Sequence, residues 1–161
     1  MKLIVAVDNK WGIGRDNKLL CNIPEDMAFF VKQTTHKTII MGRNTYESLP
    51  KRPLPNRNNI VLTSNLSYDA NGAEVANSYE DMYNLIANDN PEDVYVIGGA
   101  KLYNDLIAEC DELYITKILA DLNADTFIVD IDKLANFVIM SESEIKEHNG
   151  IKYQFVKYIK K

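Results

Sequence analysis

The feature that most constrains the fold is a set of short, mainly apolar runs separated by longer polar segments. These runs cover residues 3–7, 37–41, 59–64 and 94–97. A strand that is apolar along its whole length is typical of the interior of a parallel sheet, where both faces are covered. The segments between the runs show helical spacing of apolar residues, as at residues 79–88. This alternation of strands and helices predicts an α/β fold.

The C-terminal part of the chain has a different pattern. Residues 153–159 alternate in places between apolar and polar, and Asn149-Gly150 directly before them is a strong hairpin signal. We therefore expect a single-domain α/β fold with a central, mostly parallel, twisted β-sheet, a C-terminal antiparallel hairpin and about four flanking helices. The length of 161 residues suits one domain, residues 1–161, with a substantial core.

Composition and charge exclude several classes of function. The net charge of −5 argues against a nucleic-acid surface. No apolar run is long enough to span a membrane, and residues 1–7 are too short for a signal peptide, so a cytoplasmic protein is expected. Cys21 and Cys110 share no ligand spacing with each other or with either histidine, which argues against a metal site. A monomer is the default expectation.

Residues 23–34 predict a helix that carries one unusual carboxylate. Pro24 suits the first helical position, and Asp26 lies at the edge of the apolar stripe. Asp26 is interpreted either as a first-turn acid that complements the positive helix end, or as the polar group of an apolar pocket. The local pattern alone favours the first interpretation. The stripe itself consists of Ile23, Met27, Phe30, Val31 and Thr34.

Two apolar runs lead directly into glycine and then into a predicted helix. Residues 37–41 precede Gly42-Arg43-Asn44-Thr45 and a helix over 45–49, and residues 94–97 precede Gly98-Gly99-Ala100-Lys101. Helix N-termini at strand ends are typical phosphate sites, although an ordinary cap or a tight turn explains each one equally well. Taken together, the pair suggests a ligand with separate phosphates, lying across the carboxyl ends of the strands.

Two further segments point to function without defining it. Residues 8–18 form a long polar loop, and such loops in compact domains are usually functional. Its Gly12-x-Gly14 lacks the third glycine of a dinucleotide fingerprint. Arg57 follows a stiff proline turn over residues 52–57 and is either a surface cation or an arginine held for a carboxylate.

These pieces, in this order, resemble the dihydrofolate reductase family. The ordered set covers the chain nearly end to end, although no single motif is decisive. The matching stretches are Gly12-Ile13-Gly14, Asn22 to Asp26, Ile40 to Ser48, Arg52 to Arg57, Ile97 to Tyr103, and Asp125-Thr126.

The resemblance implies NADPH-dependent reduction of 7,8-dihydrofolate to tetrahydrofolate in one-carbon metabolism, and binding of antifolates such as methotrexate or trimethoprim. Asp26 and Thr116 match the catalytic pair, with Asp26 promoting protonation of N5 while C6 receives the hydride. Arg57 matches the arginine for the glutamyl carboxylate, and Arg52 lies near that tail. The other implied substrate-binding residues are Ile4, Val5, Ala6, Met27, Phe30, Leu49, Leu54, Ile97 and Tyr103.

For the cofactor, the resemblance implies two phosphate seats and a closing loop. Gly42, Arg43, Asn44 and Thr45 match the first seat, with Thr63 and Ser64 near the 2′-phosphate. An adenosine-binding subdomain is expected over approximately residues 37–90. The second seat, with a cis Gly–Gly peptide, consists of Gly98, Gly99, Ala100, Lys101, Leu102 and Tyr103. The nicotinamide side is assigned to Ala6, Ile13, Gly14, Asn17, Lys18, Leu19 and Ile97.

Two departures from the family pattern leave alternatives open. Leu19-Leu20-Cys21 stands where the family has Leu-Pro-Trp, and Lys101 stands where some relatives have arginine. The loss of the tryptophan bears on turnover more than on fold. The alternatives are a pyrimidine reductase of riboflavin synthesis with the same fold, and a folate- or NADPH-binding protein with weak catalysis.

Overall fold

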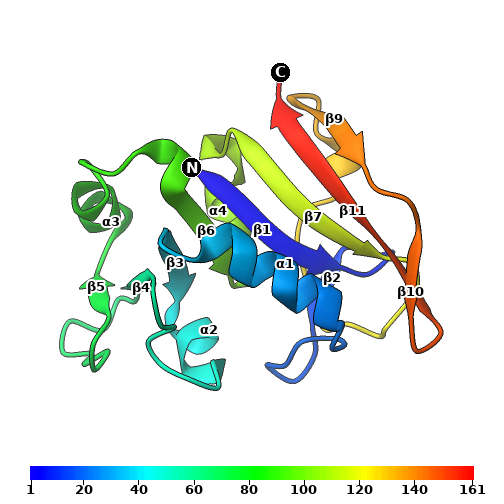
Figure 1. The fold of residues 1–161 in the computed structure, drawn as a ribbon. Helices are drawn as coiled ribbons and strands as arrows, with labels where there is room; N and C mark the ends of the chain where they lie inside the picture. Colours follow the sequence, from blue (N-terminus) through cyan, green and yellow to red (C-terminus); the bar gives the residue numbers. More distant parts are fainter.

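The computed structural model describes residues 1–161 and contains one central nine-stranded sheet (Figure 1). The strands lie in the order β10-β11-β7-β1-β6-β3-β4-β5, and β9 also pairs with β11. Their bounds are β1 Lys2–Val7, β3 Thr38–Gly42, β4 Asn58–Leu62, β5 Glu74–Ala76, β6 Val94–Gly98, β7 Glu112–Ile118, β9 Phe137–Glu142, β10 Lys146–His148 and β11 Ile151–Lys160. A small second sheet pairs β2, Gly12–Gly14, with β8, Thr126–Phe127.

The pairings confirm the predicted fold class. β1, β3, β4, β5, β6 and β7 pair in parallel, whereas β9, β10 and β11 join antiparallel. The parallel strands are the mainly apolar runs because both of their faces are covered; Ile39, Ile40 and Met41 of β3 have no exposed surface. The side chains of Leu3, Ile60 and others continue this core across the sheet.

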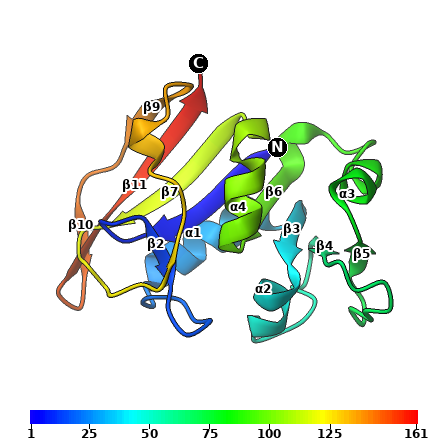
Figure 2. The same cartoon turned by 180° about the vertical axis from the view of Figure 1, so that it is seen from behind.

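Four α-helices flank the sheet, and no helix is long and apolar enough to cross a bilayer. α1, Pro24–Thr34, lies across one face and α4, Ala100–Leu106, across the other, as Figure 1 and Figure 2 show. α2, Arg43–Ser48, follows β3, and α3, Tyr79–Leu85, lies near β5. Short 3-10 turns cover Pro91–Asp93, Ile107–Glu109 and Ile131–Lys133.

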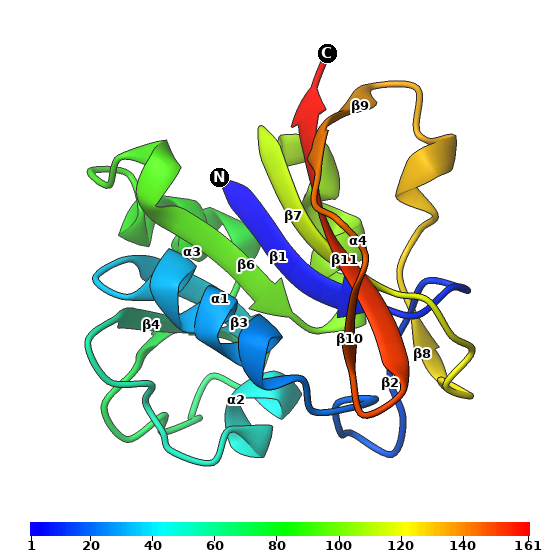
Figure 3. The same cartoon turned by 45° about the vertical axis from the view of Figure 1, so that its right-hand side comes forward.

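The structure corrects some expected boundaries. α2 begins at Arg43 rather than at Thr45, so Arg43 is itself helical. β11, the second strand of the predicted C-terminal hairpin, lies inside the sheet, because β7 pairs with it along one side while β10 and β9 pair along the other (Figure 3). The strands β2, β5 and β8 have two or three residues each, too few to produce a recognisable periodic pattern.

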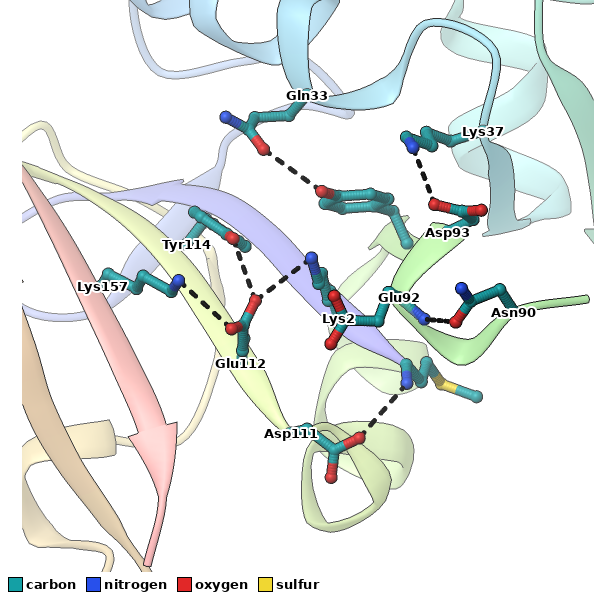
Figure 4. A network of polar contacts seen from close by, with 12 residues as sticks. Lys2, Gln33, Lys37, Asn90, Glu92, Asp93, Asp111, Glu112, Tyr114 and Lys157 are labelled. Atoms are coloured by element: carbon teal, nitrogen blue, oxygen red, sulfur yellow. Dashed lines mark hydrogen bonds and ion pairs between the residues drawn. The ribbon is translucent and has the colours of Figure 1, made fainter.

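At the amino ends of β1 and β7, ion pairs between charged side chains connect neighbouring strands (Figure 4). The carboxylate of Glu112 lies 3.2 Å from the ammonium groups of both Lys2 and Lys157, and it accepts a hydrogen bond from the Tyr114 hydroxyl at 3.0 Å. Burial alone would raise the pKa of Glu112, but these bonds outweigh it and lower the pKa. These residues therefore form a structural ion-pair network. It lies at the opposite end of the strands from the carboxyl ends, where the predicted site residues gather.

Candidate active site

Asp26 and Thr116 meet between α1 and β7. The Thr116 hydroxyl donates a hydrogen bond of 2.6 Å to Asp26 Oδ1. Asp26 lies in the first turn of α1, because Pro24 starts the helix, and Thr116 is a buried residue of β7 paired with Ala6 of β1. The carboxylate thus faces the sheet as well as the helix terminus, which favours the pocket interpretation over that of a simple first-turn acid.

The surroundings of Asp26 favour its neutral form. Burial raises the pKa of the Asp26 carboxyl, and the hydrogen bond from Thr116 only partly opposes that shift. Burial raises the pKa values of Cys21 and of the Tyr103 phenol, and the charge of Asp26 adds to both shifts. These two side chains therefore lie within electrostatic range of the carboxylate. A carboxyl group with a raised pKa in such a place is suited to proton chemistry.

The two glycine turns lie side by side at the carboxyl ends of β3 and β6. These strands pair in parallel, with Met41 opposite Gly98. A Cβ atom built on Gly42 would come within 3.9 Å of the Gly99 nitrogen, and one built on Gly98 within 3.1 Å of Thr45 Oγ1. The predicted cis peptide joins Gly98 to Gly99. The sheet thus unites two segments that are more than 50 residues apart in the sequence.

Only glycine suits position 98. Its φ of +142° lies in a region that residues with a Cβ rarely adopt, and the space beside it is filled by Thr45. The Tyr103 hydroxyl lies close by and donates a hydrogen bond of 2.8 Å to the Ile4 carbonyl of β1. Tyr103 therefore connects the second glycine turn to the central strand that precedes the polar loop.

Arg57 is fixed against the last turn of α1. Its Nε donates to Thr34 Oγ1 and its Nη1 to the Pro55 carbonyl, both at 2.8 Å, while the guanidinium carbon lies 5.9 Å from the centre of the Phe30 ring. Burial lowers the pKa of Arg57, and no carboxylate of the chain forms an ion pair with it. A half-buried arginine with free N–H donors is suited to an anionic ligand.

Asn59 shapes the turn that presents Arg57, although it is not among the predicted site residues. Its buried side-chain amide accepts from the Leu54 N–H at 2.9 Å and donates to the carbonyls of Leu54 and Arg57 at 3.0 and 3.2 Å. The available signal was a polar amide at the start of an apolar strand, because a buried amide needs hydrogen-bonding partners. Thr34 was assigned only to the helix stripe, although its hydroxyl accepts the Arg57 bond.

The polar loop after β1 is held by two aspartates. Asp8 is buried, and its carboxylate accepts the backbone N–H groups of Lys10 and Gly12 at 3.0 and 2.8 Å. Farther along, the Asp16 N–H donates to Asp125 Oδ2 at 3.0 Å, next to the pairing of β2 with β8. This contact lowers the pKa of Asp125. The loop is therefore fastened at its tip by a surface carboxylate.

The predicted site residues fall into three groups of exposure. The buried ones are Ile4, Gly98, Leu102, Tyr103 and Thr116. The half-buried ones are Val5, Ala6, Ile13, Gly14, Asp26, Phe30, Gly42, Thr45, Leu49, Leu54, Arg57, Thr63, Ile97, Gly99 and Ala100. The exposed ones are Asn17, Lys18, Leu19, Met27, Arg43, Asn44, Arg52, Ser64 and Lys101.

The apolar stripe expected on α1 does not face the core throughout. Met27 and Val31 are 46% and 45% exposed, whereas Phe29, which falls off the stripe, packs 4.9 Å from the Phe155 ring, centre to centre. Ile23 and Thr34 of the stripe are buried, so the predicted side of the helix is covered only in part, and Phe29 adds a second buried side. Exposed large apolar side chains beside a carboxylate are typical of a small-molecule site.

A separate hollow of about 300 Å³ lies between α1, β7 and β11, beside Phe29, Tyr114 and Phe155. It contains none of the predicted site residues. The carboxylate, the glycine turns and the tethered arginine instead gather elsewhere, around α1 and the carboxyl ends of the parallel strands, where ligands bind in open α/β sheets. We therefore place the candidate active site at these strand ends.

Comparison with known proteins identifies the family of the chain. The family model described as dihydrofolate reductase matches residues 1–160. The chain belongs to the dihydrofolate reductase family. Membership of this family over the full length of the chain assigns it the NADPH-dependent reduction of dihydrofolate to tetrahydrofolate. It also sets aside the riboflavin-pathway alternative.

Individual members of the family are similar over their full length. Dihydrofolate reductase of Bacillus subtilis is 41% identical, covering 100% of this chain and 95% of that protein. Dihydrofolate reductase of Staphylococcus aureus is 36% identical, covering 100% and 98%. A solved dihydrofolate reductase of Enterococcus faecalis, in complex with NADP(H) and RAB-propyl, has a TM-score of 0.87 at 35% identity, covering 99% of this chain and 95% of that one.

Proposed function

We propose that Asp26 and Thr116 form the centre at which the chain reduces dihydrofolate. The observation that carries this proposal is the 2.6 Å hydrogen bond between them, made by a carboxyl group whose pKa burial raises. Asp26 would bind the polar edge of the pterin and promote protonation of N5. Thr116 orients the carboxylate, because its hydroxyl occupies Oδ1 and leaves Oδ2 free for the ligand.

The glycine turns fit a dinucleotide phosphate. Gly98 and Gly99 carry no Cβ where one would crowd Thr45, so backbone N–H groups stay accessible to an anion. Gly42, Asn44, Thr45 and residues 98–103 would hold the phosphates, with Arg43, Thr63 and Ser64 at the 2′-phosphate. When bound, NADPH supplies the hydride for C6 of the pterin.

The length of α1 matches the substrate. Asp26 lies in its first turn and Thr34, the partner of Arg57, in its last, a separation of about 12 Å at 1.5 Å per residue. The pterin would lie at Asp26, with Met27, Phe30, Leu49, Leu54 and Ile97 as walls, and the glutamyl carboxylate would reach Arg57. Antifolates with the same polar edge, such as methotrexate or trimethoprim, would use Asp26 in the same way.

The loop over residues 12–18 would exclude water during the reaction. Its tip is fastened by Asp125 and its base by Asp8, so it can cover the nicotinamide side of the site without leaving the sheet. Exclusion of water lowers the local dielectric and strengthens the interaction between the Asp26 carboxylate and a protonated pterin.

The adenosine-binding subdomain would comprise approximately residues 37–90. The support is that β3, β4 and β5 are consecutive at one end of the sheet and that α2 and α3 follow them in this segment. We further propose that the protein acts as a cytoplasmic monomer, a compartment in which its two cysteines stay free thiols.

The direct test is oxidation of NADPH by the purified protein. We expect consumption only when dihydrofolate is present, and much less with NADH as donor. Tight binding of both ligands without turnover would instead indicate a folate- and NADPH-binding protein with weak catalysis.

A further inference from the structure

Arg43 is the proposed ligand for the 2′-phosphate, yet its guanidinium already has a carboxylate partner. Arg43 Nε donates a hydrogen bond of 2.8 Å to Glu47 Oε1, one helical turn later in α2. That hydrogen bond and the charge of Glu47 raise the pKa of Arg43. Both side chains are partly exposed, at 45% and 36%, so a ligand can approach the pair from solvent.

Tyr68 restricts where the guanidinium can lie. The Arg43 guanidinium carbon is 4.8 Å from the centre of the Tyr68 ring, which is half-buried and packs against the core cluster around Tyr46. With one face against this ring, Arg43 can reach ligands only through its edges. Glu47 occupies the edge that contains Nε, which is one of the two edges suited to bidentate binding of a phosphate.

We propose that Glu47 is a specificity-determining residue, whose carboxylate competes with a cofactor phosphate for Arg43 and so limits the preference for 2′-phosphorylated nucleotides. The inference rests on the proposed function, in which Arg43 contacts the 2′-phosphate. The competition has two parts: the phosphate must displace the carboxylate from Nε, and it must bind near a second negative charge. Both parts act on the 2′-phosphate, and neither acts on a nucleotide that lacks it.

Replacing Glu47 by glutamine removes the negative charge at residue 47 but keeps an acceptor that can orient the Arg43 guanidinium. The amide oxygen of Gln can still accept from Arg43 Nε, while the negative charge is lost. Since exposed charges interact weakly, we expect Glu47→Gln to bind 2′,5′-ADP roughly threefold to tenfold more tightly, with the gain shrinking at high salt. Binding of 5′-AMP, which lacks the 2′-phosphate, should stay unchanged. A matched control is Glu92→Gln, which removes the same charge near the start of β6.

The experiment is calorimetric titration of the full chain with both nucleotides, for wild type, Glu47→Gln, Glu92→Gln and Arg43→Gln. If Arg43→Gln leaves 2′,5′-ADP binding unchanged, the assignment of Arg43 to the 2′-phosphate is wrong. If Arg43→Gln weakens that binding but Glu47→Gln leaves it unchanged or weaker, only the competition by Glu47 is refuted. Tighter binding of 2′,5′-ADP alone in Glu47→Gln supports the inference.

Discussion

Asp26 and Thr116 are 90 residues apart in the sequence, and a 2.6 Å hydrogen bond joins them in the proposed active site. The bond orients one carboxylate oxygen, and burial keeps the carboxyl group easier to protonate than an ordinary aspartate. The same burial disfavours the charged form in the folded state. The free energy of unfolding should therefore rise as the pH falls through the raised pKa of Asp26, opposite to the usual behaviour of a paired aspartate.

Arg57 provides a residue-scale test of substrate orientation. Arg57→Gln should raise KM for dihydrofolate roughly tenfold to a hundredfold, since charge-assisted hydrogen bonds contribute about 1.5–3 kcal/mol. A dihydropterin without the glutamyl tail should be reduced equally well by both proteins. Lys152→Gln is the matched control, because Lys152 is an exposed cation on β11 and belongs to none of the predicted site residues. Equal KM changes for both substrates would show that Arg57 does not contact the tail.

Cys21 provides a second residue-scale test. It is half-buried and packs against the cluster of Ile23, Ile118 and Tyr153, so a much larger side chain at this position would meet these neighbours. Cys21→Trp should therefore lower stability by about 1–3 kcal/mol through overpacking and slow the chemical step. Thermal unfolding and single-turnover hydride transfer measure both effects, with Cys21→Ser as control. A faster step at unchanged stability would contradict the packed arrangement.

At the scale of single residues, the sequence pointed to Asp26 but not to the polar side chains that support the site. Asp26 stood out because a carboxylate on an apolar stripe needs an explanation. Thr116 came only from the family resemblance, because one hydroxyl within a strand carries no local signal. Asn59 was missed, since its role depends on a turn whose backbone groups converge only after folding.

At the scale of elements, the contact between the loop tip and Asp125 is open to test. Asp125→Ala removes the acceptor of the Asp16 N–H and should slow hydride transfer roughly tenfold or more, because small misplacements at the reacting centre are costly. Hydrogen exchange at Asp16 should accelerate in parallel. The pKa of Asp125 is lowered chiefly by this bond, so the contact persists at neutral pH and is lost only as pH falls through that lowered pKa.

The control for the loop is Asp121→Asn, which removes a nearby charge but leaves the Asp16–Asp125 bond in place. An unchanged hydride-transfer rate in Asp125→Ala, despite faster exchange at Asp16, would separate loop order from catalysis.

Long, buried helices and strands could be predicted from the sequence, whereas short or exposed ones could not. The parallel strands β1, β3, β4 and β6 were identified because covering both of their faces makes them mainly apolar along their length. The exposure of Met27 and Val31 was not predicted, since an apolar stripe looks the same whether it faces a core or a ligand. β5 and the β2–β8 pair depend on tertiary contacts and leave no periodic pattern in so few residues.

At the scale of the whole molecule, the ion pairs of Glu112 lie at the amino ends of the central strands, whereas the proposed active site lies at the carboxyl ends. Glu112→Gln should lower stability at neutral pH by about 1–2 kcal/mol, because it breaks the bonds to Lys2 and Lys157, while turnover stays unchanged. Since the pKa of Glu112 is lowered in the folded state, its contribution is present above the unfolded pKa and disappears as pH falls through the folded one. Thermal unfolding across pH measures this, and a difference that persists in strong acid would contradict it.

The most direct test of the whole account is single-turnover hydride transfer against pH, for wild type and Asp26→Asn. At neutral pH the variant should lose roughly 10²–10⁴ in rate, the usual range for general acid–base assistance, while ligand binding changes modestly. The deficit should shrink as pH falls, because dihydrofolate then protonates more readily without help from Asp26. The variant should also unfold at higher temperature, since it buries no charge. An unchanged rate at neutral pH, or a deficit independent of pH, would return Asp26 to a structural role at the helix terminus.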